Sequence, residues 1–531
     1  MSERLNERKD ILMKDFAGGP ISTVAFDDLR AGSGLKEFGL STRRLLVFVL
    51  MQMLFMVAVR PITDPDFWWH LRTGQFIFET RTIPHTDIFS GLFSGKEWVA
   101  HEWLSEVLMY MIQRALGYGG LVVTFALLIM TALLITYRRS AKRAAHPYVA
   151  GFALLLCALA SAPTWGVRPQ IFSLLFATVF IAVLDDYARE GKGRAVFYLP
   201  PLMVLWVNMH AGFALGLALI ALTIAGLFLN EWLVPEAETR QPVWPRVRRL
   251  FLVLLACVMA VALNPNGLRL YSYPFETLTS QAMMKHIQEW FSPDFHELMF
   301  LPTAALIFAM LAVLALSKKR VKPCEVLMLA ATGYAALRSG RNIPFFAMVS
   351  MPLLAEHAWN WATSLRAGQW LTAPEKREEG GASVMLKLVI NVVLLLLMPA
   401  TLCVLRVRQV VDGRAADESK NYPVAAVEFI RAHRVPQPIY NEYGWGGYLI
   451  KHLYPEYRVY IDGRADVYGD AFIEEFLKTH DGEANWREPL ERDGVRTVIV
   501  GPNVALASLL RGDGGWDKVF EDQKSVIFVR K

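Results

Sequence analysis

GGLVVTFALLIMTALLITYRR, residues 119–139, has 19 uncharged positions before Arg138 and Arg139. A helix of about 20 apolar residues is long enough to cross the hydrocarbon core of a bilayer. Basic residues directly after such a run are typical of a helix that ends at a membrane surface. The stretch therefore predicts a transmembrane helix.

Comparable apolar runs recur on both sides of this stretch. We expect eleven spans, at residues 45–60, 119–137, 147–163, 169–185, 196–209, 212–230, 248–264, 300–316, 324–338, 342–358 and 384–405. The chain of 531 residues is 54% hydrophobic and only 20% charged, which argues against a soluble protein of this length. The sequence predicts a polytopic α-helical membrane protein.

Basic residues are distributed unevenly between the loops. One set of alternate loops carries 18 Lys and Arg residues, whereas the opposite set carries five besides the long first loop. Because basic loops stay in the cytoplasm, we expect a cytoplasmic N-terminus, and an odd number of spans then places the C-terminus outside. The net charge of +6 follows from this topology. The scattered basic residues form no clustered face for nucleic acid.

Three regions follow along the chain: a cytoplasmic segment at 1–44, a membrane domain at 45–405 and a soluble domain at 406–531. The membrane domain includes an outer loop, 61–117, which we expect to form short helices along the membrane surface because it is rich in Phe and Trp. The last region alternates polar helices with β-type runs, which predicts a small extracytoplasmic α/β domain. Its expected strands are 438–441, 458–461, 496–500 and 525–529.

The outer loop opens with Asp64-Pro65-Asp66 and reaches His70 four residues later. Two carboxylates beside a histidine can hold a divalent cation, act as a general base or orient a sugar hydroxyl. Asp64 could instead cap a helix that begins at Pro65. The residues alone therefore leave open a metal site, a catalytic role and a capping role for these side chains.

A second polar motif, His101-Glu102-Trp103-Leu104-Ser105-Glu106, lies later in the same loop. Ser105 stands where the HExxH motif of zinc proteases requires its second histidine, which excludes that motif. Glu102 and Glu106 are four residues apart and are expected to share one face of a helix.

Further polar residues fall at the predicted outer ends of the spans. They are Arg168, Asn208, His210 and Arg269, together with Arg338 and Arg341 between the ninth and tenth spans. Basic residues are depleted in short outer loops, so the last two arginines indicate an anionic ligand such as phosphate. Outer carboxylates combined with outer arginines suggest a site for a lipid phosphate and a reaction at its linkage.

A family resemblance rests on the motifs DPDFWWHLRTG (64–74), PHTD (84–87), HEWLSE (101–106), NMHAGF (208–213), NPNGLRL (264–270) and RNIPFF (341–346). With a first span before them and many spans after, they resemble the GT-C superfamily of membrane glycosyltransferases. The closest resemblance is to a bacterial GT-C-like group related to the dolichyl-phosphate-mannose mannosyltransferase type. YNEYGWGGYLI (440–450) and YIDGRADVYGD (460–470) resemble the C-terminal domain of that group, so the likeness covers most of residues 45–480.

The resemblance implies transfer of a sugar from a polyprenyl-phosphate donor to a glycan, lipid or protein acceptor outside the cytoplasm, in a bacterial inner membrane. By position, the catalytic carboxylate is Asp66 or Asp64. Their neighbours differ from those in the better-known subfamilies, so the choice between them and the need for a divalent metal ion, bound by Asp64, Asp66 and His70, stay open. Arg338, Arg341 and Arg168 are expected to bind the donor phosphate. The expected acceptor-binding or supporting residues are His70, His101, Glu102, Asn208, His210 and Arg269.

Two other functions stay open, a lipid or glycan transporter and a non-catalytic assembly subunit that kept the fold. A transporter is expected to have charged or broken helices near the middle of the membrane, whereas these polar motifs lie at outer ends. In the C-terminal region, Asp462-Gly463-Arg464-Ala465-Asp466 suggests a turn in which Arg464 pairs with an Asp, or alternatively a surface that recognises the acceptor.

Overall fold

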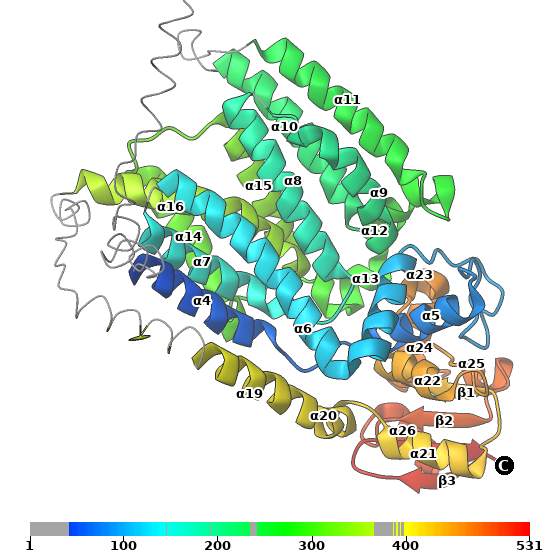
Figure 1. Cartoon of the computed structure of the whole chain (residues 1–531). Helices are drawn as coiled ribbons and strands as arrows, with labels where there is room; N and C mark the ends of the chain where they lie inside the picture. Colours follow the sequence, from blue (N-terminus) through cyan, green and yellow to red (C-terminus); the bar gives the residue numbers. More distant parts are fainter. Residues whose placement is uncertain are drawn as a thin grey trace, which may run out of the picture. The chain divides into compact units, whose positions relative to one another are not determined.

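The computed structural model describes residues 42–144, 146–191, 193–233, 242–365 and 398–531, together with residues 386, 389, 390 and 393. The chain divides into two compact units, and the larger one, residues 50–373 and 402–531, contains the whole candidate site. Helices make up most of this unit, and a small sheet lies near the C-terminus (Figure 1).

Long apolar helices coincide with the predicted spans. They are α4 (Thr42–Ala58), α6 (Trp103–Ala144), α7 (Pro147–Ser161), α8 (Gln170–Glu190), α9 (Leu199–Met209), α10 (Phe213–Leu233), α11 (Val243–Val261), α14 (Leu301–Leu316), α15 (Pro323–Arg338) and α16 (Ile343–Ser364). The first ten predicted spans each fall on one of these helices. The eleventh, 384–405, lies largely outside the described residues, and α19 (Met398–Asp412) covers its end.

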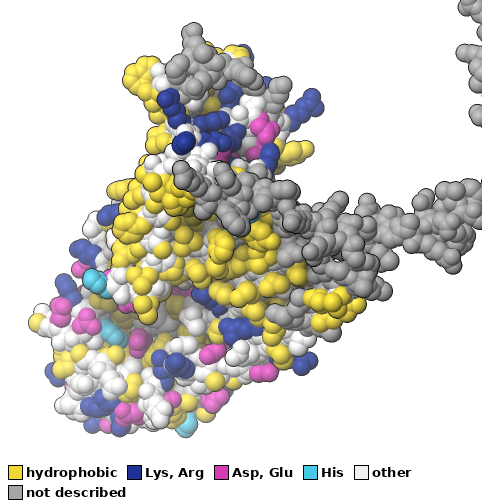
Figure 2. All heavy atoms as spheres, turned by 90° about the vertical axis from the view of Figure 1, so that its left-hand side faces the viewer, with side chains coloured by type: hydrophobic (Ala, Val, Ile, Leu, Met, Phe, Trp, Pro, Cys, Tyr) yellow, Lys and Arg dark blue, Asp and Glu magenta, His cyan; other side chains and the backbone are white. Residues whose placement is uncertain are grey.

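Five helices of the described residues are long and apolar enough to cross a membrane, namely α6, α7 with the turn after it, α8, α10 and α14 with the turn before it. Large apolar side chains on them are exposed, such as Phe152 on α7 and Phe308 on α14. Figure 2 shows hydrophobic side chains gathered in a broad zone on one face, with charged side chains beyond it. An exposed apolar surface of this kind suits lipid. The chain is a helical membrane protein, and the count of eleven spans stays a prediction.

The outer loop contributes one complete helix and the start of another. α5 (Phe67–Thr80) buries one apolar face, and residues 103–116 form the first part of α6 before Gly117 interrupts it with φ 67° and ψ −165°. The short helices expected in this loop are therefore present, whereas their position along the membrane surface stays a prediction. α5 crosses α6 closely at Gly74, where a Cβ atom would lie 2.0 Å from the backbone oxygen of Glu106.

Shorter helices and the small sheet complete the unit. Between the long helices lie α12 (Tyr273–Thr279), α13 (Gln281–His286) and the 3-10 turns η5 (Gln288–Trp290) and η7 (Gly340–Asn342). The C-terminal domain contains α20 (Arg414–Asn421), α21 (Val424–His433), β1 (Ile439–Asn441), α22 (Gly446–Leu453), α23 (Ala465–Tyr468), α24 (Asp470–His480), α25 (Arg487–Arg492), β2 (Thr497–Val500), α26 (Ala505–Gly512), β3 (Trp516–Glu521) and β4 (Val526–Arg530).

The sheet has four strands in the order β1-β2-β4-β3. β1 runs parallel to β2, with Ile439 opposite Thr497, and β4 is antiparallel to both of its neighbours. Three of the four predicted strands match β1, β2 and β4. The expected strand at 458–461 is wrong, because within it only Val459 pairs, in a single parallel bridge to Ser90 of the outer loop.

The C-terminal domain packs against the outer loop, with α22 lying along α5 (Figure 1). Backbone hydrogen bonds join Gly91 to Val459 at 2.9 Å and Val459 to Phe89 at 3.1 Å. Arg464 is only 2% exposed and donates from Nη1 to Asp87 of the loop at 2.6 Å. The loop and the domain therefore form one packed body.

Candidate active site

Polar side chains from several segments meet where α5 packs against the start of α6. Of the residues expected from the sequence, those linked by contacts here are Asp64, Asp66, His70, His101, Glu102, Arg168 and His210, and they are joined by Glu106 and Glu289. The close crossing at Gly74 brings His70 of α5 next to the HEWLSE motif.

Asp64 is held from two sides. Its Oδ1 accepts a hydrogen bond from the backbone N–H of Asp66 at 2.9 Å, and its Oδ2 lies 2.9 Å from Nε of Arg168. Arg168 also makes a two-point ion pair with Glu289 on η5, with 3.1 Å between Nη2 and Oε2. α5 begins two residues later than a cap at Asp64 requires, so that expectation is wrong. Asp64 instead braces the turn before α5 and binds Arg168.

The side chain of Asp66 lies against the C-terminal domain at Gly463. Its Oδ1 accepts a hydrogen bond from Nε1 of Trp69 at 3.1 Å, and a Cβ atom on Gly463 would lie 1.7 Å from the same oxygen. Burial, together with the nearby charge of Asp64, raises the pKa of Asp66 to about 8. The backbone at Gly463 thus covers a carboxyl group that can take up and release a proton near neutral pH.

Three histidine side chains lie next to the carboxylate of Glu102. Its Oε1 lies 3.2 Å from Nε2 of His101 and 3.4 Å from Nε2 of His210, and its Oε2 lies 3.4 Å from Nδ1 of His70. Burial disfavours the charge on Glu102, but His101 and the other two histidines outweigh it and hold its pKa well below the usual range. Glu102 is therefore a carboxylate at the centre of the cluster.

The groups that face the ring nitrogens of His210 and His101 indicate which of these nitrogens carry a hydrogen. Nδ1 of His210 accepts from the backbone N–H of Gly212 at 2.9 Å, so the neutral ring carries its hydrogen on Nε2, which faces Oε1 of Glu102. Nδ1 of His101 faces the carbonyl of Val99 at 3.1 Å and Nε2 faces the carboxylate, so both nitrogens must donate. Burial lowers the pKa of His210 to about 3, whereas for His101 the Glu102 carboxylate outweighs burial and raises the pKa. His101 and Glu102 form an ion pair.

Arg341 is a cation beside this cluster. Its guanidinium lies 4.5 Å from the ring centroid of Trp290, and among the described residues no carboxylate lies within ion-pair distance of it. The segment that carries it is tied to η5, because Oγ of Ser339 donates to the carbonyl of Glu289 at 2.8 Å. Arg341 therefore belongs to the same network as Arg168 and Asp64, yet its own charge has no anionic partner there.

Three other expected residues have different surroundings. Arg338 is exposed at the end of α15, with Nη2 lying 3.6 Å from Sδ of Met284. Arg269 lies on the surface and pairs with Glu276, at 2.8 Å, and with Glu97, at 3.3 Å. The amide of Asn208 accepts from Nε1 of Trp103 at 2.8 Å and donates to backbone carbonyls of α9 and α11's following turn. The structure does not bring these three side chains to Asp64 and Asp66 by any direct contact among the described residues.

The expected metal ligands are not assembled as a set. Among the described residues, the donors that all lie within 4.8 Å of one another belong to His70, Glu102 and Glu106, and the group includes neither aspartate. Sequence reasoning did not select Glu106 or Glu289. The spacing of four residues between Glu102 and Glu106 was a usable signal for Glu106. Glu289 lies in the short turn η5, where no sequence pattern marks it.

Gly463→Ala is expected to lower stability by about 1–3 kcal/mol, because the new Cβ atom cannot fit beside Oδ1 of Asp66 and must displace the turn or the carboxyl group. Thermal unfolding of the purified protein measures the effect. Gly444→Ala is the matched control, since its Cβ atom would have no neighbour within 4 Å. Equal melting temperatures for the two variants would contradict the close approach.

No protein-family model matches the chain, and no curated protein matches it. Several solved structures are similar to it. The oligosaccharyltransferase of Archaeoglobus fulgidus tethered to an acceptor peptide aligns with a TM-score of 0.52 at 13% identity, over 92% of this chain and 74% of that one.

The same organism's AglB, in complex with an inhibitory peptide and a dolichol-phosphate, aligns with a TM-score of 0.50 at 12% identity, over 86% and 69%. ArnT of Cupriavidus metallidurans bound to undecaprenyl phosphate gives 0.47 at 13% identity, over 91% and 97%. The two oligosaccharyltransferase alignments cover most of both chains. The chain therefore has the fold of the GT-C superfamily of membrane glycosyltransferases.

Proposed function

We propose that this protein transfers a sugar from a polyprenyl-phosphate-linked donor to an acceptor on the extracytoplasmic side of a bacterial inner membrane. The observation that carries the proposal is the cation of Arg341, which has no carboxylate partner among the described residues and shares a contact network with Asp64 and Asp66. The dolichol-phosphate bound by the similar AglB structure supports the donor class.

The orientation rests on the distribution of basic residues between loops. It places the outer loop, the C-terminal domain and the candidate site on the extracytoplasmic side, with the N-terminus in the cytoplasm. Polyprenyl-phosphate sugars carry their sugar at the membrane surface, so a site at the ends of the spans can reach it. The acceptor is a glycan, a lipid or a protein.

Arg341 is the proposed ligand of the donor phosphate. A guanidinium without a carboxylate partner can bind two phosphate oxygens at once and stabilise the charge that develops on the leaving phosphate. Arg168 already pairs with Asp64 and Glu289, so its role is to hold Asp64 and to add positive charge nearby. Arg338 would meet the phosphate only at the outer edge of the site, since it is exposed.

Asp66 is the proposed base, with Asp64 as its alternative. In the transfer step the acceptor hydroxyl gives its proton to Asp66, and the acceptor oxygen forms a bond to the anomeric carbon of the sugar. The bond from that carbon to the phosphate oxygen breaks, and the polyprenyl phosphate leaves with its negative charge at Arg341. A carboxyl group with a pKa near the working pH is suited to this exchange.

His101, Glu102 and His210 are proposed to support the site rather than to take part in proton transfer. Their polar atoms face one another, and the His101–Glu102 ion pair lies in the loop before α6.

Arg341→Ala is expected to weaken binding of undecaprenyl phosphate by about 10- to 150-fold, which corresponds to the loss of a charged hydrogen bond worth about 1.5–3 kcal/mol. Native mass spectrometry of the purified protein measures the binding. Lys285→Ala, which removes an exposed cation from α13, is the control and should bind as the unmodified protein does. Equal affinity in both variants would remove Arg341 from the phosphate site.

Lipid analysis of a deletion strain tests the function as a whole. The strain is expected to accumulate a polyprenyl-phosphate sugar and to contain an acceptor that lacks one sugar, and the intact gene should restore both. Restoration by the Asp66→Asn and Asp64→Asn genes alike would favour the non-catalytic assembly subunit. An unchanged lipid and acceptor profile in the deletion strain would reject the transferase.

A further inference from the structure

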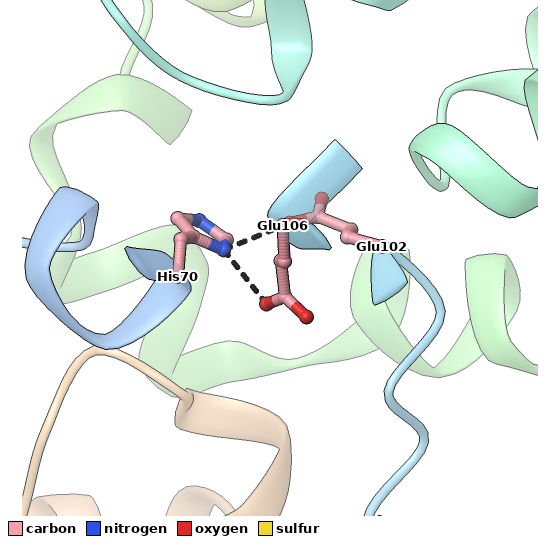
Figure 3. Close-up of side chains that lie close together, drawn as sticks. All are labelled: His70, Glu102 and Glu106. Carbon is pink, nitrogen blue, oxygen red and sulfur yellow. Dashed lines mark hydrogen bonds and ion pairs between the residues drawn. The ribbon is translucent and has the colours of Figure 1, made fainter. Parts of the chain in front are cut away.

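His70, Glu102 and Glu106 bring three donor atoms within 4.8 Å of one another. Figure 3 shows the histidine next to both glutamates. Nδ1 of His70 lies 3.0 Å from Oε1 of Glu106 and 3.4 Å from Oε2 of Glu102. The side chains are 6%, 11% and 2% exposed for His70, Glu102 and Glu106. The histidine comes from α5 and the glutamates from the start of α6, so two helices supply the group.

The protein's own hydrogen bonds leave this group incomplete. Oε1 of Glu102 faces His101 and His210, and the one partner of its Oε2 among the described residues is His70. Nδ1 of His70 carries at most one hydrogen, which can serve only one of the two glutamate side chains at a time. Oε2 of Glu106 is buried and has no hydrogen-bond partner among the described residues. Buried carboxylate oxygens without donors are costly, and a cation relieves that cost.

We propose that His70, Glu102 and Glu106 bind a divalent cation of the first transition series through Nδ1 of His70 and a carboxylate oxygen of each glutamate. One imidazole nitrogen and two carboxylate oxygens suit Mn²⁺ or Zn²⁺ better than Mg²⁺ or Ca²⁺, which prefer oxygen ligands alone. The cation replaces the hydrogen on Nδ1, and the neutral ring keeps its hydrogen on Nε2. The proposal stands whether or not the protein transfers sugars.

The packing of α5 on α6 holds the donors at this spacing before any cation arrives. At Gly74, one turn beyond His70 on α5, the absence of a side chain lets α5 approach the backbone of Glu106. A bound cation would cross-link the two helices at this crossing. The ring centroid of Trp69 lies 3.7 Å from that of His70, and Nε1 of Trp69 donates to Asp66. By fixing His70, the cation would therefore help to position Trp69 and, through it, the carboxyl group of Asp66.

Metal content of the full chain, purified in detergent, tests the proposal. The protein is treated with a chelator, incubated with Mn²⁺ or Zn²⁺, desalted and analysed by elemental mass spectrometry. We expect a single bound ion per chain, and the loss of most of it in Glu106→Gln, which keeps the shape of the side chain. Glu79→Gln is the control, because it removes the same charge from an exposed position on α5. No retained ion in the unmodified protein, or equal retention in Glu106→Gln, would overturn the proposal.

A second measurement uses only the unmodified chain and so does not depend on the folding of a variant. Adding Mn²⁺ to the chelator-treated protein should raise its melting temperature with increasing concentration, since the ion binds the folded state. Pulsed electron paramagnetic resonance of the Mn²⁺ complex should detect one coupled imidazole nitrogen. A melting temperature that does not respond, or a spectrum without nitrogen coupling, would reject His70 as a ligand.

Discussion

Asp66→Asn is expected to lower the rate of sugar transfer by about 10²- to 10⁴-fold, the usual contribution of a general base. Asparagine has nearly the same shape and can still accept the hydrogen bond from Trp69, but it cannot take the acceptor proton. Donor binding should be unaffected, because Arg341 supplies the contact to phosphate. A loss of transfer with intact binding therefore separates the base from the phosphate ligand.

Single-turnover transfer from a synthetic polyprenyl-phosphate sugar measures this rate. Asp294→Asn serves as the control, since Asp294 is exposed in the loop before α14 and is expected to have no role in transfer. Asp64→Asn tests the alternative base. Full activity in both Asp64→Asn and Asp66→Asn would refute the proposed base, although the fold would be unaffected.

Arg464→Met is expected to destabilise the contact between the outer loop and the C-terminal domain by about 3–5 kcal/mol, the cost of leaving buried charges without a partner. Nε and Nη2 of Arg464 donate to Asp462 at 2.8 and 2.6 Å, and Nη1 donates to Asp87 at 2.6 Å. Methionine fills most of the space but leaves both carboxylates uncompensated. The pairing with an Asp expected from the sequence is confirmed for Asp462, and Asp87 adds a partner from the loop.

Denaturant unfolding in detergent measures the loss. Arg492→Met is the matched control, because Arg492 also pairs with two carboxylates, Glu475 and Asp493, but its side chain is 49% exposed. Exposed pairs contribute about 0–1 kcal/mol, so the control should change little. Similar destabilisation by the two substitutions would mean that the burial of Arg464 does not govern its contribution.

The helices were predictable because length and hydrophobicity alone identify a segment that suits a bilayer. The C-terminal sheet was harder to predict. β3 was missed because it is an edge strand with exposed Asp517, Lys518 and Glu521, which lack the apolar alternation of a half-buried strand. The false strand at 458–461 pairs only through Val459, with Ser90 of the outer loop, and nothing in the local pattern indicates a partner so far away.

The predicted topology indicated which residues lie at the outer ends of the spans, and some of these residues meet in the candidate site. Asp64 and Arg168 both lie at predicted outer ends of spans, and the structure joins them in an ion pair. The cover over Asp66 was not predictable, because Gly463 has no functional group and acts only by the close approach of its backbone. Asn208 was expected to bind the acceptor or to support the site, but the sequence does not reveal that its amide is already hydrogen-bonded to Trp103 and to backbone carbonyls.

The ion pair between Asp87 and Arg464 joins residues that are 377 positions apart in the chain. At a synthesis rate of about 5–20 residues per second, Arg464 leaves the ribosome roughly 20–75 s after Asp87. During that interval the newly made outer loop has neither its ionic partner nor the domain that covers its aromatic side chains. A nascent chain of this protein would therefore need protection of the loop, by lipid or by a holding chaperone, until its last fifth has been translated.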